Sequence, residues 1–235
     1  MPTPLKGCVA ECIGTFALCF FGCASIILTA THPGSGADLV TVALAHGLVL
    51  AVFVTGALHI SGGQFNPSVS IALIVRGKQT PQQAALYILS QCIGAACGCG
   101  ALVFFLGADV ANNAEAGTNL GATIGSLTTD GNTLAVFGLE VLLTFALMFT
   151  ILRCLVDDRT PVKHGGIAVG IVVACCIVAF GPLTGASMNP ARSLGPALYG
   201  HWDMHWVYWA APIVGAVLAS IVDATFFASE PATSD

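Results

Sequence analysis

Six long apolar runs constrain this chain more than any other feature of its sequence. A run of roughly 18 or more apolar residues is long enough to cross a bilayer as a helix. Only 8% of the residues are charged, against roughly 25% in an ordinary soluble domain, so too few charges exist to cover a water-facing surface. The sequence therefore predicts an all-α, multi-pass membrane protein. The predicted transmembrane helices cover residues 8–30, 39–60, 82–107, 134–156, 165–182 and 206–228.

Two further apolar segments, residues 66–76 and 189–199, are too short to span the membrane. At about 1.5 Å per helical residue, each reaches only about half of a roughly 30 Å hydrocarbon core. Each begins with an Asn-Pro pair that follows glycines. Asn is a strong N-cap residue, Pro fits the first helical turn, and glycine allows a sharp turn ahead of them. We therefore predict two re-entrant half-helices that begin at Asn66 and Asn189.

The two halves of the chain repeat each other. Glu11 opens the sequence ECIGTF in the first half, and Glu140 opens EVLLTF in the second. A unit of three spans and one half-helix is an odd number of crossings, so the second copy must be inverted in the membrane. Inverted repeats with broken helices are typical of transport pathways. We expect a single channel domain over residues 1–235, with repeats at about 8–107 and 134–228 and a linking loop at 108–133.

The basic residues predict the orientation. The connections 31–38 and 108–133 contain no Lys or Arg, and the positive-inside rule places basic loops in the cytoplasm. Both termini are therefore expected to be cytoplasmic, although the sequence does not name the membrane. The basic residues on the predicted cytoplasmic side are Lys6, Arg76, Lys78, Arg153, Arg159 and Lys163.

Arg192 is the remaining basic residue, and it lies inside the second short segment. A charge at membrane depth either lines a water-filled path or snorkels to the headgroups. If the two half-helices meet near the bilayer centre, each N-terminus carries roughly half a positive charge, and each cap Asn offers amide N–H donors. Such a centre favours the oxygen of a passing water molecule and disfavours protons and cations. The residues thus predict a pore for neutral solutes.

The motifs around the two asparagines resemble the aquaporin, or major intrinsic protein, family over nearly the whole chain. The resemblance also includes 201-HWDMHWVYWAAP-212. The segments 43-ALAHGLVL-50 and 181-GPLTGASMNPARSLGPA-197 are most similar to the tonoplast intrinsic protein and aquaporin-8 branch. This family resemblance implies the aquaporin fold and a homotetramer with one pore per subunit. The central motif residues are Asn66, Pro67 and Ser68, and Asn189, Pro190 and Ala191.

The resemblance also implies a four-residue selectivity filter, made here of His46, Ile177, Ala186 and Arg192. Strict water channels of the family usually have an aromatic residue and a His at the first two positions, so this filter should be wider and asymmetric. The implied function is a passive channel for water, with ammonia and hydrogen peroxide as further solutes. In the family, glutamates placed like Glu11 and Glu140 hold the half-helix loops, with a proton relay as the alternative.

Three other functions remain to be weighed. Glycerol or urea facilitators of the family usually have Asp after the filter Arg, whereas this chain has Ser193. An ion channel conflicts with Arg192 and two converging positive helix ends. The ten cysteines allow a membrane redox protein based on Cys and His, but no spacing forms a zinc site or a nucleophile–base pair. Cys8, Cys12, Cys19 and Cys23 instead predict a helix-packing stripe.

We therefore expect a channel and not an enzyme, with no catalytic residue, no metal and no cofactor. Its expected partners are water, small neutral solutes and membrane lipid, and no nucleic acid. Gln64 stands where many relatives have His, and Ser68 stands where many have Ala. The sequence explains neither of these two residues.

Overall fold

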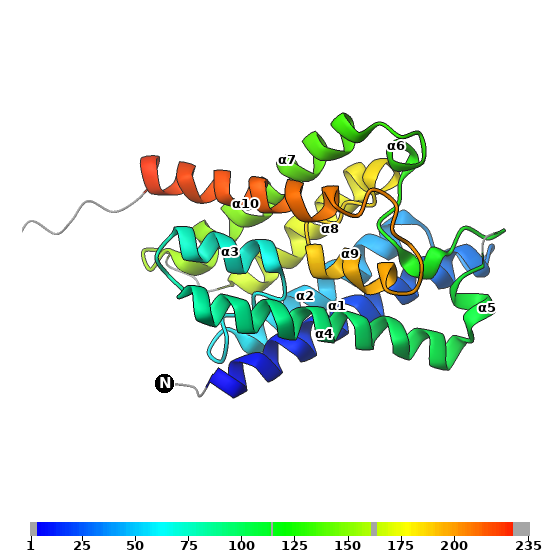
Figure 1. Ribbon diagram of the computed structural model, residues 1–235, viewed down its shortest axis with the longest axis horizontal. Helices are drawn as coiled ribbons and strands as arrows, with labels where there is room; N and C mark the ends of the chain where they lie inside the picture. Colours follow the sequence, from blue (N-terminus) through cyan, green and yellow to red (C-terminus); the bar gives the residue numbers. More distant parts are fainter. Residues whose placement is uncertain (1–3, 114, 161–163, 228–235) are drawn as a thin grey trace, which may run out of the picture.

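The structure is a computed structural model that describes residues 4–113, 115–160 and 164–227 (Figure 1). Six of its helices are long and apolar enough to cross a membrane, and each begins and ends within a few residues of a predicted span. These helices are α1 (Pro4–Thr31), α2 (Leu39–Ala57), α4 (Pro81–Leu106), α7 (Thr133–Ile151), α8 (Gly165–Thr184) and α10 (Val207–Phe226). A π-helical turn, η2 (Leu152–Val156), continues α7. The protein is an integral multi-pass membrane protein, as predicted.

The two short segments form the half-helices α3 (Pro67–Val75) and α9 (Pro190–Ala197). Asn66 and Asn189 cap them, because the side chain of Asn66 accepts one backbone N–H of the first turn and that of Asn189 accepts two. In Figure 1, α3 occupies the left part of the molecule and α9 the right part, and the two approach each other near the middle. The predicted pair of half-helices is confirmed.

The linking connection contains more structure than the sequence predicted. It includes α5 (Ala108–Ala111), the 3₁₀ turn η1 (Asn119–Gly121) and α6 (Ser126–Thr129). Tertiary contacts hold α5 and η1 against α1 and α4, and α6 against α7 and α8. Tyr208 in α10 hydrogen-bonds Thr128 at 2.8 Å and donates to the Thr184 carbonyl at 2.7 Å. The division into repeats at 8–107 and 134–228 stays a prediction.

Small residues bring the long helices together in pairs. Gly94 in α4 lies against the backbone of Cys12 in α1, and Gly215 in α10 lies against Val141 in α7. A Cβ at either glycine would collide with the facing carbonyl, so the glycines set the close approach of the helices. Cys19 and Cys23 of α1 are buried in the α1–α4 interface. The predicted packing stripe therefore holds for these two cysteines, whereas Cys8 and Cys12 are half-buried.

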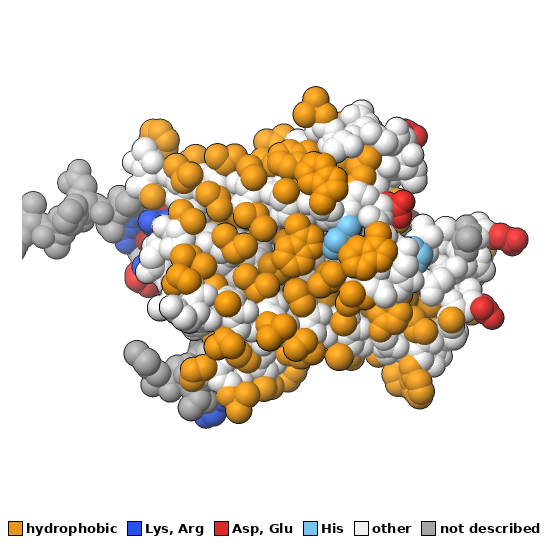
Figure 2. All heavy atoms as spheres, viewed as in Figure 1, with side chains coloured by type: hydrophobic (Ala, Val, Ile, Leu, Met, Phe, Trp, Pro, Cys, Tyr) orange, Lys and Arg blue, Asp and Glu red, His pale blue; other side chains and the backbone are white. Residues whose placement is uncertain are grey.

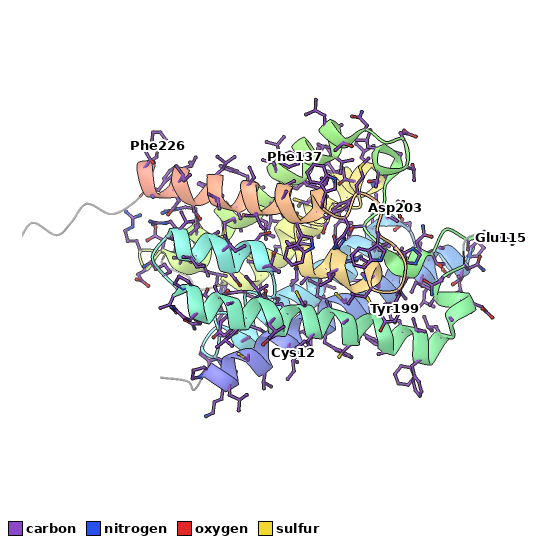
Figure 3. The ribbon with its side chains drawn as sticks, viewed as in Figure 1. Cys12, Glu115, Phe137, Tyr199, Asp203 and Phe226 are labelled. Carbon is purple, nitrogen blue, oxygen red and sulfur yellow. The ribbon has the colours of Figure 1, made fainter. Side chains whose placement is uncertain are left out.

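Along the long axis of the molecule, the surface has an apolar middle between two polar ends. Figure 2 shows apolar side chains over most of the visible face and Lys and Arg side chains gathered at one end. Figure 3 places Phe226 at this end and Glu115 and Asp203 near the opposite end. An apolar band between two polar ends suits a protein that crosses a bilayer. That the basic end faces the cytoplasm stays a prediction.

An ionic cluster joins three elements at the basic end. Asp223 of α10 is buried and pairs with Arg76, which follows α3, at 2.9 Å, and with Arg153 of η2 at 2.8 Å. Arg153 also pairs with Asp157. Hydrogen bonds from Arg159 hold the pKa of the Asp157 carboxyl well below its usual range, so this carboxylate stays ionised in mild acid.

Replacing Asp223 by Asn should destabilise the fold by about 3 kcal/mol, because removing one member of a buried ion pair leaves the other charges uncompensated. Chemical denaturation in detergent measures this effect. The exposed Asp130 provides the matched control, and Asp130→Asn should leave the midpoint unchanged. Equal midpoints for the two variants would show that the cluster contributes nothing to stability.

Candidate functional site

Glu11 holds the backbone loop that precedes α3. Its carboxylate is fully buried and accepts hydrogen bonds from the N–H groups of Gln64 at 2.9 Å and Phe65 at 2.6 Å. The hydroxyl of Ser61 donates to the same carboxylate at 2.6 Å. Gln91, a polar residue in the otherwise apolar α4, adds a fourth donor at 2.8 Å. Every one of these donors is directed at the acid, so its charge is compensated inside the protein.

Glu140 repeats this arrangement in the second half of the chain. It is fully buried and accepts from the N–H groups of Ser187 at 3.0 Å and Met188 at 2.8 Å. The Thr184 hydroxyl donates to it at 2.8 Å. Thr184 and Ser61 each stand five residues ahead of a cap Asn. Sequence reasoning missed both hydroxyls, and aligning the two repeats on the asparagines would have found them.

The loops that the two glutamates hold are conformationally unusual. Phe65 and Met188, each directly before a cap Asn, have positive φ angles of 49° and 53°. Ala186 also has a positive φ, of 43°. Left-handed backbone costs roughly 1–2 kcal/mol for a residue with a Cβ atom, so these loops need the hydrogen bonds of the two carboxylates to persist.

The two asparagines connect the halves of the molecule. Asn66 Nδ2 donates to the Met188 carbonyl at 2.8 Å, and Asn189 Nδ2 donates to the Phe65 carbonyl at 2.8 Å. The sequence predicted only that each cap Asn offers amide N–H donors. In the structure, one hydrogen of each amide is used across the interface and one remains. Pro67, Ser68, Pro190 and Ala191 are buried in the first turns behind them.

Two cavities adjoin beside the half-helices, and we call them together the path. The first, of about 350 Å³, extends from Lys78 and Asp158 at the basic end to Arg192, and both cap asparagines line it. The second, of about 320 Å³, lies among the ends of α1, α2 and α8 and the 108–133 connection. His46, Ile177 and Gly185 line both cavities. Ala186 and Arg192 line the first, so all four predicted filter residues line the first cavity and two of them also line the second.

Arg192 and His46 fix each other in this region. Arg192 is only 3% exposed, which rules out the snorkelling alternative. Its Nη2 lies 3.3 Å from Nε2 of His46, and Nδ1 of His46 lies 2.8 Å from the Val42 carbonyl. A carbonyl only accepts and a guanidinium only donates. The imidazole is therefore neutral, with its hydrogen on Nδ1 and its lone pair directed at Arg192.

A second nitrogen of the Arg192 guanidinium, Nη1, is buried and unpaired among the described residues. An unpaired buried N–H group is costly unless a solute or water satisfies it. Arg192 lines the first cavity, so this unpaired donor belongs to a residue of the path.

Gln64 belongs to a polar chain behind the first loop. It accepts from the Ser70 hydroxyl at 2.6 Å and donates to Gln79 at 2.9 Å. Gln91 in turn donates to Ser70 at 3.1 Å. The residue that the sequence left unexplained therefore ties α3 to the segment that follows it. The Ser68 hydroxyl is buried and unpaired within the described part of the chain, and the structure does not explain it.

Two half-helices that meet at their N-termini beside two adjoining cavities, inside a six-span helical protein, define a membrane channel. The family model described as "Major intrinsic protein" matches residues 2–223. Aquaporin TIP4-4 of Zea mays is 42% identical over 234 residues, covering 94% of this chain and 88% of the maize protein. Nodulin-26 of Glycine max is 37% identical, with 93% and 76% covered.

A solved structure, the aquaglyceroporin from Plasmodium falciparum, superposes with a TM-score of 0.82 at 25% identity, covering 95% of this chain and 97% of the other. The chain belongs to the major intrinsic protein family. It is a channel for water and small solutes and not an enzyme. The family resemblance of the sequence and the predicted fold class are confirmed.

Proposed function

We propose that His46, Ile177, Ala186 and Arg192 form the selectivity filter, and that the pore conducts water, ammonia and hydrogen peroxide while excluding protons and ions. The observation that carries this proposal is that three donor-bearing residues line the first cavity. They are Arg192, whose Nη1 has no partner among the described residues, and Asn66 and Asn189, each with one further amide hydrogen. A neutral solute with a lone pair satisfies these donors, whereas a hydrated cation does not.

Exclusion of protons follows from the same donors. The N-termini of α3 and α9 face each other and each contributes roughly half a positive charge. A water molecule between the two asparagines accepts hydrogen bonds with its oxygen and cannot accept from the next water in the file. The hydrogen-bonded chain that proton hopping requires is thereby interrupted, and the positive field raises the energy of any cation.

The filter is proposed to be wide for a water channel. Ile177 is apolar and Ala186 is small, while the His46 ring is drawn to Arg192. Glycerol is the second candidate solute, because the solved relative is named an aquaglyceroporin. Here the residue after Arg192 is Ser193, whose hydroxyl hydrogen-bonds Thr123 at 2.7 Å and Ser187 at 2.5 Å. Because this hydroxyl joins the 108–133 connection to α9 through these hydrogen bonds, it is not free to bind a solute.

Flux measurements on one preparation of proteoliposomes test the solute range. Stopped-flow light scattering should show water permeation well above that of protein-free vesicles, and an internal pH dye should show ammonia entry. A peroxide probe should report peroxide entry, glycerol should equilibrate no faster than through lipid alone, and no proton current should appear. Ammonia or peroxide entry at the protein-free rate, or rapid glycerol entry, would contradict the proposed range.

The variant His46→Phe should reduce ammonia flux more than water flux. A Phe ring fills more of the path and removes the acceptor that holds Arg192 at 3.3 Å, so the opening narrows. Leu48→Phe, which adds the same ring to an exposed position of α2, is the control and should conduct normally. Equal losses of ammonia and water flux in His46→Phe would argue against a filter role for this residue.

The support role of Glu11 and Glu140 and the family-type homotetramer belong to the same proposal. For the glutamates, the donors around each carboxylate favour loop support over a proton relay. For the assembly, many large apolar side chains are exposed along the helices, where either lipid or further subunits can cover them. Native mass spectrometry from mild detergent should give four chains per particle, and a monomer would contradict the proposed tetramer.

A further inference from the structure

Gly22 of α1 lies against the imidazole of His46. A Cβ atom at this glycine would stand 2.5 Å from Nε2, 2.7 Å from Cδ2 and 2.9 Å from Cε1 of His46, and these are its three nearest atoms. Carbon atoms in ordinary contact are roughly 3.5–4.0 Å apart. The ring therefore occupies space that exists only because residue 22 has no side chain.

Gly22 differs from the glycines of the long helices that are crowded by a facing backbone. Gly94, Gly170 and Gly215 meet the backbone carbonyl of a facing helix, which is the usual reason for glycine in a packed membrane helix. The three nearest neighbours of Gly22 all belong to one side chain, and that side chain lines both cavities of the path. The missing side chain of Gly22 therefore makes room for a residue that lines the path and does not bring two helices together.

The His46 ring has little freedom to adjust. Its Nδ1 donates to the Val42 carbonyl at 2.8 Å, one turn earlier in α2, and its Nε2 accepts from Arg192 at 3.3 Å. A methyl group at residue 22 would push the ring off α1. The ring would then move into the path or turn away from Arg192, and the guanidinium would lose its only side-chain hydrogen-bond partner among the described residues.

We infer that Gly22 is a fifth specificity-determining position of this channel. Because Gly22 leaves room for the His46 ring against α1, the lone pair of Nε2 is directed at Arg192 and the ring stays out of the path. Gly22 is thus a positioning residue that acts through His46. This inference rests on the proposed filter role of His46 and Arg192, and it predicts that a single methyl group on α1 changes which solutes pass.

A double-mutant cycle tests the inference. Water and ammonia fluxes are measured in proteoliposomes with equal amounts of inserted protein for wild type, Gly22→Ala, His46→Ala and the double variant. Gly22→Ala should lower both fluxes several-fold and change the ratio of ammonia to water flux. In the His46→Ala background the colliding ring atoms are gone, so adding Gly22→Ala should change neither flux.

Two glycine controls separate the pore from helix packing. Gly138 of α7 has open space at its Cβ position, and Gly138→Ala should conduct as wild type does. Gly7 lies on the same helix as Gly22 and is crowded by Tyr87 instead, so Gly7→Ala should leave the ratio of the two fluxes unchanged even if less protein inserts.

Wild-type flux from Gly22→Ala would overturn the inference, as would the same loss with and without the His46 ring, because the effect would then come from packing. Failure of the proposed function is a separate result. It would appear in the wild-type protein as ammonia flux at the level of protein-free vesicles, whatever residue 22 does.

Discussion

Replacing Glu140 by Ala is expected to abolish water flux and to cost about 2–6 kcal/mol of stability, since two buried N–H groups lose their acceptor at roughly 1–3 kcal/mol each. These groups belong to Ser187 and Met188. Met188 has a positive φ, so without the carboxylate the loop can relax to ordinary backbone angles. The cap Asn189 would then leave its position in the path.

Water flux in proteoliposomes and chemical denaturation in detergent measure the two effects. Glu140→Gln should also be impaired, because its amide nitrogen would face one of the N–H groups that the carboxylate oxygens now accept. The exposed Glu115 provides the control, and Glu115→Ala should match the wild type. Wild-type flux in Glu140→Ala would show that the second loop keeps its shape without this acid, and the loop-support role would be wrong.

Asn189→Asp is expected to lower water flux strongly and to admit a proton leak. The carboxylate has no donor for the Phe65 carbonyl, which Asn189 now satisfies at 2.8 Å, so two acceptors would face each other. The added negative charge would also cancel much of the positive field of the two helix ends. We expect a loss of stability of about 1–3 kcal/mol from the unpaired carbonyl.

The leak is measured as acidification of vesicles under a pH gradient, and water flux is measured on the same preparation. Asn132→Asp is a matched control, because Asn132 caps α7 at an exposed position and Asp is as good a cap as Asn there. It should behave as wild type. If Asn189→Asp conducts water normally and excludes protons, then neither the amide donor nor the helix ends control the pore.

The sequence predicted the parts of the fold that depend on local chemistry. Run lengths gave the six spans, and the Asn-Pro pairs gave the first residues of both half-helices, because capping is decided by adjacent residues. The short helices between residues 108 and 129 were missed. They depend on distant contacts such as those of Thr128 with Tyr208 and Thr123 with Ser193, which no local pattern contains.

The candidate site was predictable to the level of residue types and not of their pairing. Spacing from the two asparagines identified His46 and Arg192, yet their mutual hydrogen bond appears only in three dimensions. The crossed amide bonds of Asn66 and Asn189 were missed for the same reason. Gly22 could not be recognised, since glycine is common in this chain and only the position of the imidazole distinguishes it.

The crossed amide bonds also bear on how the chain is made. Their partners are 122 and 124 residues apart, so the ribosome releases Phe65 and Asn66 long before Met188 and Asn189 exist. Until then, the Phe65 carbonyl and the Asn66 Nδ2 group lack the partners that they have in the finished protein, and unpaired polar groups are costly in lipid. We therefore expect the central loop of the first three spans to stay hydrated until the second repeat supplies these partners.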